Sequence, residues 1–267
     1  MSAPFPLPRS LNRKIWRAVT EFGLIAPGDR ILAGFSGGKD SAFLLYALRS
    51  LQLHNRLIPF TLEAVTLDAG FNPAFPPETM KEYAARLGVA WHLIPTKIAA
   101  LLAESNDPCA RCSFFRRGAI LRFARERGFN AIAFAHHHDD AVETFLMSIL
   151  YSGKIQTFLP RTELDGGLSL IRPLAYLREA EIRKALPLLD FTPVPSGCPY
   201  EAGTQRRKTK DLLKKLCREN RFVYPNLAAA MRASGTLDLW PPLPGKEEMR
   251  EIHRRFFGRE EPPENGI

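Results

Sequence analysis

The stretch that decides the fold is Ile31-Leu32-Ala33-Gly34-Phe35-Ser36-Gly37-Gly38-Lys39-Asp40-Ser41, an apolar run that leads into a glycine-containing hexapeptide and then a helical pattern. This order predicts a strand, a tight loop and a helix. Glycines let successive backbone N–H groups turn towards an anion, and a helix start adds positive dipole charge. The hydroxyls of Ser36 and Ser41 add donors. Lys39 can offset phosphate charge, and Asp40 suits a metal ion or a proton.

Two interpretations of this loop compete. A serine–glycine turn can simply cap a helix, and a bare Ser-Gly-Gly would favour that interpretation. The full hexapeptide between a strand and a helix instead indicates phosphate binding. It does not match the pattern G-x-x-x-x-G-K-[ST], which disfavours an ordinary Walker-type nucleotidase.

Outward from the loop, strand and helix patterns alternate. The helices are expected at about 10–23, 41–50, 77–87, 114–127 and 139–151, and further strands at about 60–67, 91–94 and 131–135. Such alternation predicts an α/β fold with a doubly wound parallel sheet, whose ligands bind at the carboxyl ends of the strands.

The pattern changes after about Gly153. Short apolar stretches flank the turn Asp165-Gly166-Gly167, a helix starts near Arg178, and a basic helix covers about Thr204–Glu219. We therefore expect a small, mainly helical C-terminal extension. The predicted segments are an N-terminal helical segment at 1–28, the α/β domain at 29–190 and a basic region at 191–267. The tail, with proline-rich stretches at 241–244 and 260–264, is predicted to be partly disordered at its end.

Composition limits the class of protein. The chain has 267 residues, 45% of them hydrophobic, and lacks an apolar run of about 18 residues, which disfavours a membrane helix. Its start lacks the pattern of a signal peptide. Four cysteines are too few for a disulfide scaffold, so we interpret them as thiols or metal ligands in a reducing compartment. We predict a cytoplasmic protein with no membrane partner.

The net charge is +9 at pH 7. Two clusters account for much of the excess, one at 116–127 and one at 206–218. A basic host proteome explains the charge alone equally well, but clustering favours a nucleic-acid partner because each phosphate contact releases counterions.

The cysteines allow three interpretations. Cys109 and Cys112 form a C-x-x-C pair, Cys198 lies in a distant loop, and Cys217 lies in the basic helix. They could form a four-cysteine zinc site, a redox pair, or a three-cysteine iron–sulfur site with one open iron. Chemistry alone favours zinc, although the absence of a second C-x-x-C weakens that choice.

A second polar segment follows the strand expected at 131–135. It contains His136-His137-His138-Asp139-Asp140, with Glu143 one helical turn after Asp139. An aspartate N-cap with a solvated first turn is the structural interpretation. A functional interpretation is favoured, because this strand should end at the same edge of the sheet as the phosphate loop.

The hexapeptide resembles the signature of the N-type ATP pyrophosphatases (the PP-loop superfamily), which split ATP between its α and β phosphates and pass AMP to a substrate oxygen. Within that superfamily, residues 10–220 resemble the tRNA 2-thiocytidine synthetases, or tRNA-cytidine 2-sulfurtransferases. The segment from Ala135 to Asp140 is similar to their G-H-x-x-D-D motif, with Ala135 replacing glycine. Cys109, Cys112 and Cys198 match the ligands of their [4Fe–4S] cluster.

This resemblance implies ATP-dependent tRNA thiolation. The C2 oxygen of a cytidine in the anticodon loop, at position 32, would be adenylated and then replaced by sulfur, which an open iron could present. Mg²⁺ would bridge the phosphates with Asp40 and Asp140, and Arg116 would stabilise the α-phosphate. The residues implied in catalysis are Asp40, Arg116, Asp140, Cys109, Cys112 and Cys198, of which the cysteines are the metal ligands. The residues expected to contact ATP and its metal are Ala33, Phe35, Ser36, Gly37, Gly38, Lys39, Asp40, Ser41, Asp68, Ala135, His136 and Asp139.

The implied partners are tRNA and a sulfur donor, such as a cysteine desulfurase or free sulfide. Relatives are often dimers, so a homodimer is one expected assembly. Three alternatives remain. Cys198-Pro199-Tyr200 is closer to the 2-thiouridine tRNA thiolases, and a lysidine-type ligase uses the same loop without a cluster. A nucleotide- and RNA-binding iron–sulfur module without turnover is the third.

Overall fold

The computed structural model describes residues 4–55, 58–200, 203–232 and 245–257. The chain divides into two compact units, Met1–Met231 and Arg232–Ile267. Helix α10 (Lys246–Phe257) is the described element of the second unit. The proline-rich stretches at 241–244 and 260–264 lie outside the described residues, as does the predicted disorder at the chain end. The functional division at residues 28 and 190 remains a prediction.

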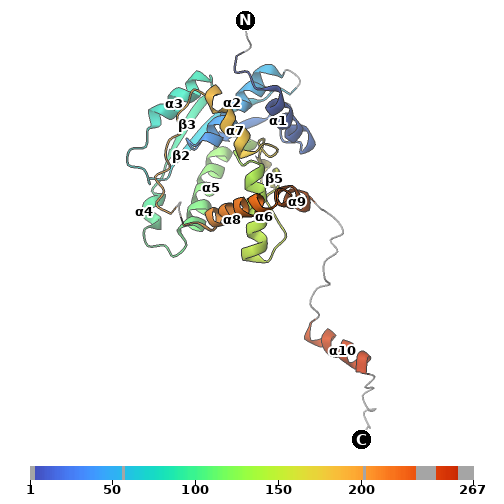
Figure 1. Cartoon of the computed structure of the whole chain (residues 1–267). Helices are drawn as coiled ribbons and strands as arrows, with labels where there is room; N and C mark the ends of the chain where they lie inside the picture. The colour runs from blue at the N-terminus through green and yellow to red at the C-terminus, as the bar shows by residue number, and fades with distance from the viewer. Residues whose placement is uncertain (1–3, 56–57, 201–202, 233–244, 258–267) are drawn as a thin grey trace. The chain divides into compact units, whose positions relative to one another are not determined.

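One sheet forms the centre of the first unit (Figure 1). Among the described residues it has six strands, in the order β3-β2-β1-β4-β6-β5. The strands are β1 (Arg30–Gly34), β2 (Thr61–Asp68), β3 (Ala90–Pro95), β4 (Ala131–Ala133), β5 (Arg161–Leu164) and β6 (Leu168–Ile171). Neighbouring strands are parallel except β5 and β6, which are antiparallel. The predicted doubly wound parallel sheet is confirmed, with an antiparallel strand added at one edge.

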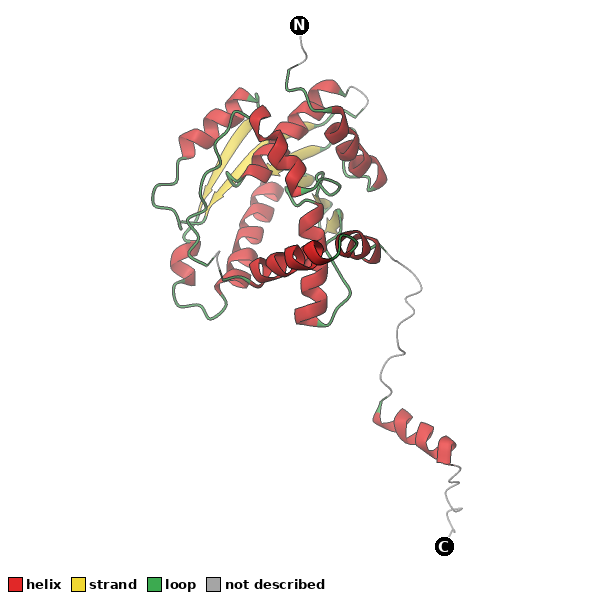
Figure 2. Ribbon diagram, in the orientation of Figure 1, coloured by secondary structure: helices red, strands yellow, loops and turns green. Residues whose placement is uncertain are grey.

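Strand β1 is buried on both faces, as its continuous apolar run predicts. Ile31 and Ala33 belong to a core shared with four helices: α1 (Arg9–Glu21), α2 (Lys39–His54), α3 (Pro77–Arg86) and α7 (Glu179–Ala185). Leu32 faces the other way and packs with α5 (Pro108–Glu126). Figure 2 shows helices packed around the sheet.

The topology defines where a ligand can bind. The chain runs from β1 outward through β2 and β3, and then returns to the other side of β1 with β4. The strand order therefore reverses between β1 and β4, and the loops at their carboxyl ends diverge to leave a crevice. The phosphate loop follows β1 and the histidine–aspartate segment follows β4, so both motifs lie at this switch point.

The C-terminal part of the first unit is helical, as predicted. Helices α6 (His138–Ser152), α8 (Gln205–Glu219) and α9 (Val223–Ala230) share an apolar cluster centred on Val142, Leu146 and Leu213. Helix α9, the short α4 (Ile98–Leu102) and the 3-10 turn η1 (Leu186–Leu188) were not predicted. No helix in the described part of the chain is long and apolar enough to cross a lipid bilayer.

Helix α5 begins six residues before its predicted start at 114. Asp107 is its N-cap, with a side-chain oxygen that accepts a hydrogen bond from Ala110 N at 3.2 Å, and Pro108 occupies the first turn. An aspartate followed by proline is a recognised helix-start signal. Cys109 and Cys112 therefore lie in the first two turns of the helix, not in a preceding loop.

Candidate functional site

The loop between β1 and α2 is closed by its own serines. Ser36 N donates to Ser41 Oγ at 3.2 Å, and Ser41 Oγ donates to Gly38 O at 2.9 Å. Gly37 has φ +82°, a left-handed conformation that glycine adopts without strain. Gly38 precedes α2 without a side-chain cap. The first amides of α2 thus remain available to an anion.

A cavity of about 660 Å³ opens beside this loop. Its size is in the range of small-molecule binding sites. Its lining comes from the ends of β1, β2, β4 and β6, from α5 as far as Ile120, and from the segment at 198–200. The predicted site residues in that lining are Phe35, Ser36, Asp40, Ser41, Cys109, Cys112, Arg116, Ala135, His136, Asp140 and Cys198. Motifs that are up to 160 residues apart in sequence therefore face a single space.

Three residues that line the cavity have a buried polar atom without a hydrogen-bond partner among the described residues, and Arg172 Nε is one of these atoms. The other two are Asp40 Oδ1 and His136 Nδ1. The other carboxylate oxygen of Asp40 accepts from Lys39 Nζ at 2.7 Å. Burial lowers the pKa of His136 to about 4, so its ring is neutral at pH 7. Because buried polar atoms are normally paired, both atoms are suited to a polar ligand or its metal ion.

Three arginines give the cavity a positive wall. Arg116 and Arg117 come from α5, and Arg172 follows β6. Burial, with the nearby charge of Arg117, lowers the pKa of Arg172 to about 10, which still leaves it cationic at pH 7. The position of Arg172 in this wall favours contact with an anionic ligand.

All four cysteines are free thiols. Cys109, Cys112 and Cys198 line the cavity. Burial raises the pKa of Cys112, the neighbouring Arg116 opposes that shift, and the charges of Cys198 and Cys109 add to it. The three sulfurs are therefore near neighbours. Cys217 instead packs against the apolar cluster of α6, α8 and α9.

A glycine brings Cys198 to the cavity. Gly197 has φ +64°, and a Cβ atom there would lie 2.9 Å from the Cβ of Asn72. Only glycine fits this close approach to the loop after β2. Val194 N also donates to Gly37 O at 2.9 Å, which ties the same segment to the phosphate loop.

The three histidines have different environments. His136 lines the cavity. His137 is the N-cap of α6: its backbone N donates to Asp140 Oδ2 at 2.8 Å, and its Nδ1 accepts from Asp140 N at 3.3 Å. His138 Nδ1 lies 2.6 Å from the hydroxyl of Tyr224 in α9. An N-cap was expected from the aspartates, but a histidine fills that position.

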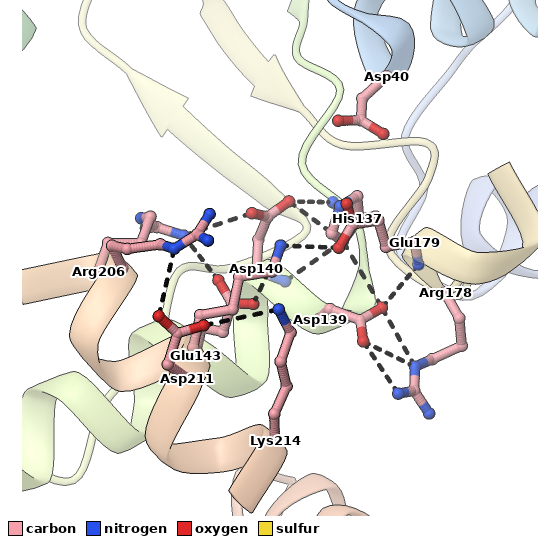
Figure 3. Close-up of polar contacts among 12 residues, drawn as sticks. Asp40, His137, Asp139, Asp140, Glu143, Arg178, Glu179, Arg206, Asp211 and Lys214 are labelled. Carbon is pink, nitrogen blue, oxygen red and sulfur yellow. Dashed lines mark hydrogen bonds and ion pairs between the residues drawn. The ribbon is translucent and has the colours of Figure 1, made fainter. Parts of the chain in front are cut away.

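Asp139 is held by α7 and is absent from the lining of the cavity. Its carboxylate accepts hydrogen bonds from Arg178 Nε at 3.0 Å and from Glu179 N at 2.8 Å (Figure 3). These contacts use both carboxylate oxygens. We therefore assign Asp139 a positioning role in place of the nucleotide contact that the motif implies.

A chain of ion pairs links the phosphate loop to the basic helix α8. Glu179 lies 3.1 Å from Lys39 Nζ and 2.7 Å from Lys210 Nζ. Arg206 Nη1 lies 3.3 Å from Asp140 Oδ1 and 3.7 Å from Glu143 Oε2 (Figure 3). No local sequence pattern marks Arg206, Lys210 or Glu179 as members of the site, because these ion pairs join segments that are distant in the chain.

Glu143 lies within this network and is only 4% exposed. Burial raises its pKa to about 7, and the charges of Lys210 and Arg206 limit the shift. Its position one turn after Asp139 indicated a functional carboxylate. The structure places it between α6 and α8, beside a second hollow that shares Asp140 and Cys198 with the cavity.

The remaining predicted residues are positioned as follows. Ala33 is buried in β1. Asp68 Oδ1 accepts from Gly70 N at 2.8 Å, so this carboxylate closes the turn after β2. Gly37, Gly38 and Lys39 belong to the phosphate loop but are not among the residues that line the cavity. Among the described residues, no group of three histidine, cysteine, aspartate or glutamate side chains has the arrangement that would hold a single metal ion.

Comparison with known proteins agrees with this geometry. Residues 8–191 match the PP-loop domain family. The fold is similar to that of the U34-tRNA thiolase NcsA from Methanococcus maripaludis, a structure with a [4Fe–4S] cluster. The TM-score is 0.70 at 18% identity, and the alignment covers 87% of this chain and 84% of that chain.

Curated relatives cover most of the chain at higher identity. The tRNA-cytidine(32) 2-sulfurtransferase of Alcanivorax borkumensis is 34% identical over 85% of this chain and 81% of its own. The enzyme of the same name from Stenotrophomonas maltophilia is 36% identical, over 84% and 75%. The chain therefore belongs to the PP-loop domain family and, within it, to the tRNA-cytidine(32) 2-sulfurtransferase family.

Proposed function

We propose that this protein thiolates cytidine 32 of tRNA in an ATP-dependent reaction that forms AMP and pyrophosphate. Family membership supports the reaction class. One structural observation carries the proposal: the phosphate loop and the three thiols of Cys109, Cys112 and Cys198 open into the same cavity. A simple nucleotidase has no use for thiols at that position, whereas a sulfur-transferring enzyme needs both chemistries within reach of one base.

The phosphate loop would hold ATP through the first amides of α2 and the hydroxyls of Ser36 and Ser41. The unpartnered Asp40 Oδ1 is a hard oxygen ligand of the kind that Mg²⁺ prefers, and Asp140 lines the same space. When bound, Mg²⁺ neutralises phosphate charge. Lys39 would exchange part of its pairing with Asp40 and Glu179 for a phosphate oxygen.

The first chemical step forms one bond and breaks another. The C2 oxygen of the cytosine attacks the α-phosphorus, and the bond to the β-phosphate oxygen breaks, so pyrophosphate leaves. Arg116, in the cavity wall, stabilises the charge on the α-phosphate in the transition state. In the second step sulfide attacks C2, the bond between C2 and the adenylated oxygen breaks, and AMP leaves. With sulfide as the sulfur source, no external oxidant or reductant is required; a persulfide from a cysteine desulfurase would first have to be reduced to sulfide by a thiol.

The three cysteines fit an iron–sulfur cluster better than a single zinc ion. They are free thiols that line the same cavity from two segments of the chain, and among the described residues no group of three ligands is arranged to hold a lone ion. Cys109, Cys112 and Cys198 would hold a [4Fe–4S] cluster, which supplies one iron without a protein ligand as a carrier for sulfide. Burial raises the pKa of the Cys112 thiol and the neighbouring Arg116 only partly opposes that shift, so ligation would have to displace the thiol proton.

Several finer points belong to the same proposal. The sulfur donor is a cysteine desulfurase or free sulfide, the protein acts in the cytoplasm, and a homodimer is one assembly. The net charge of +9 supports a tRNA partner. Mass spectrometry of nucleosides separates 2-thiocytidine from 2-thiouridine, and therefore separates this proposal from a uridine-modifying enzyme.

Reconstitution in vitro tests the proposal. Anaerobically purified protein is supplied with iron and sulfide, then incubated with ATP, Mg²⁺, sulfide and unmodified tRNA. We expect AMP and 2-thiocytidine to form in equal amounts. Cys198→Ala should abolish 2-thiocytidine while ATP binding persists, because Cys198 is not part of the phosphate loop that would hold ATP. Cys217→Ala, whose side chain packs between helices instead, is the matched control. Thiolation by Cys198→Ala, or by a colourless protein loaded only with zinc, would contradict the assignment.

A further inference from the structure

The two basic helices of the first unit differ in how their charges are used. On α8, Arg206 pairs with Asp140, Arg207 lies 3.2 Å from Asp211, and Lys210 lies 2.7 Å from Glu179. Much of its positive charge is therefore neutralised within the protein. Such cations add less to the binding of an external polyanion.

The arginines of α5 are not neutralised in this way. Arg111, Arg117 and Arg122 have no carboxylate within ion-pair distance among the described residues. Arg111 instead has its guanidinium 5.8 Å from the ring of Phe115. Glu126 is the single acidic residue between Pro108 and the end of the helix. The surface of α5 therefore presents uncompensated positive charge.

An exposed aromatic ring, Phe114, lies on the same helix as these arginines. Phe114 is 75% exposed, more than any other large apolar residue described. It contacts the ring of Phe115 edge-on, at 5.7 Å between centroids. An exposed ring of this size offers a flat apolar surface to a partner. The two residues before it in the sequence, Cys112 and Ser113, line the cavity.

We infer that the exposed surface of α5 binds the single-stranded anticodon loop of the RNA, with Phe114 as the platform on which a base stacks next to the base that enters the cavity. This inference rests on the proposed function and names the residue that positions its substrate. Unstacked bases in RNA loops stack on aromatic side chains, and adjacent arginines contact the phosphates. An exposed ring on the same helix as arginines without ion-pair partners suits this ligand, and the positive charge of that helix repels a basic protein surface.

Binding of an RNA hairpin that contains the anticodon loop tests the inference. The full chain and its Phe114→Ala and Phe114→Trp variants are compared by fluorescence anisotropy. Phe222→Ala is the matched control, since Phe222 is 54% exposed and has Arg221 4.8 Å above its ring, but lies between α8 and α9. We expect Phe114→Ala to weaken binding roughly 5- to 100-fold, the range for loss of one stacked base, and Phe114→Trp and Phe222→Ala to bind like the wild type.

Two further measurements separate the outcomes. In steady-state thiolation, Phe114→Ala should raise the KM for tRNA and keep kcat. Arg122→Gln should reduce the slope of log affinity against log salt by about one, and Arg207→Gln should reduce it less.

Equal hairpin affinity of the Phe114→Ala variant and the wild type would overturn the inference, as would a larger effect of Phe222→Ala. A change of the Phe114→Ala variant from dimer to monomer in sedimentation, without loss of RNA affinity, would assign the ring to a second copy of the chain. Failure of the proposed function is distinguishable, because the wild-type protein would then bind the hairpin through Phe114 but form no thiolated nucleoside.

Discussion

Replacing Gly37 by alanine tests whether the phosphate loop depends on one backbone conformation. Gly37 has φ +82°, and a Cβ atom added there would lie 3.1 Å from both Met80 Sδ and Val194 Cβ. A left-handed conformation costs a residue with a side chain about 1–2 kcal/mol. The close contacts add an overpacking cost of about 1–3 kcal/mol, so we expect a loss of roughly 2–5 kcal/mol in the free energy of unfolding.

Gly38 provides a control one residue away. It has φ −74° and ψ 159°, and an added Cβ would meet only Ser36 Oγ, at 3.6 Å. Alanine at this position restricts the unfolded chain, which stabilises the protein, but it is a poorer N-cap than glycine. These effects oppose each other, so Gly38→Ala should change the free energy of unfolding by less than about 0.5 kcal/mol.

Thermal unfolding followed by circular dichroism measures the difference. For a unit of this size, the loss expected for Gly37→Ala lowers Tm by roughly 5–15 °C, whereas Gly38→Ala should stay close to the wild type. Titration calorimetry with ATP follows on the folded variants. Gly37→Ala should also bind ATP more weakly, because the substitution shifts the phosphate loop. It also shifts the segment around Val194, whose N donates a hydrogen bond to Gly37 O. Equal Tm values for the two variants would refute the reasoning from φ and contact distance.

Two other predictions concern the carboxylates of α6. Native Glu143, with its pKa raised to about 7, binds a proton more tightly than the unfolded chain, so its contribution to stability is full below pH 4.5 and is lost as pH rises through 7. Denaturant titrations measure the free energy of unfolding of the wild type and of Glu143→Gln at each pH. Between pH 4.5 and 8 the wild type should lose roughly 3 kcal/mol relative to the variant. A difference that stays constant with pH would argue against a raised pKa of Glu143. Asp139→Asn should lower the free energy of unfolding by about 1–3 kcal/mol in the same assay, because the hydrogen bonds from Arg178 and from Glu179 N weaken. Its affinity for ATP should be retained. A loss of ATP affinity without a loss of stability would instead support a contact between Asp139 and the nucleotide.

The sequence was sufficient wherever a local pattern determines the structure. The run from Ile31 to Ser41 predicted β1, the loop and α2, since each feature depends on neighbours in the chain. Helix α8 was predicted to within a residue, because Thr204 caps it and Asn220 ends it. Sequence also predicted that the segments after β1 and β4 share an edge, since parallel strands bring their carboxyl ends together.

Other features depend on contacts between distant segments and could not be read locally. The role of Asp139 is set by Arg178, which lies 39 residues away. The short strand β5 is defined by its pairing with β6, not by its own composition. The start of α5, by contrast, has a local signal in Asp107 and Pro108. The prediction instead followed the basic residues further along and placed the start at 114, six residues too late.

Nucleoside mass spectrometry of cellular tRNA tests the central claim most directly. tRNA is isolated from the host strain with the gene deleted, and from that strain carrying the wild-type, Cys198→Ala or Cys217→Ala gene. We predict that 2-thiocytidine is absent after deletion, and that the wild type and Cys217→Ala restore it while Cys198→Ala does not. Unchanged 2-thiocytidine in the deletion strain, or its restoration by Cys198→Ala, would contradict the claim that the phosphate loop and these cysteines form one thiolating site.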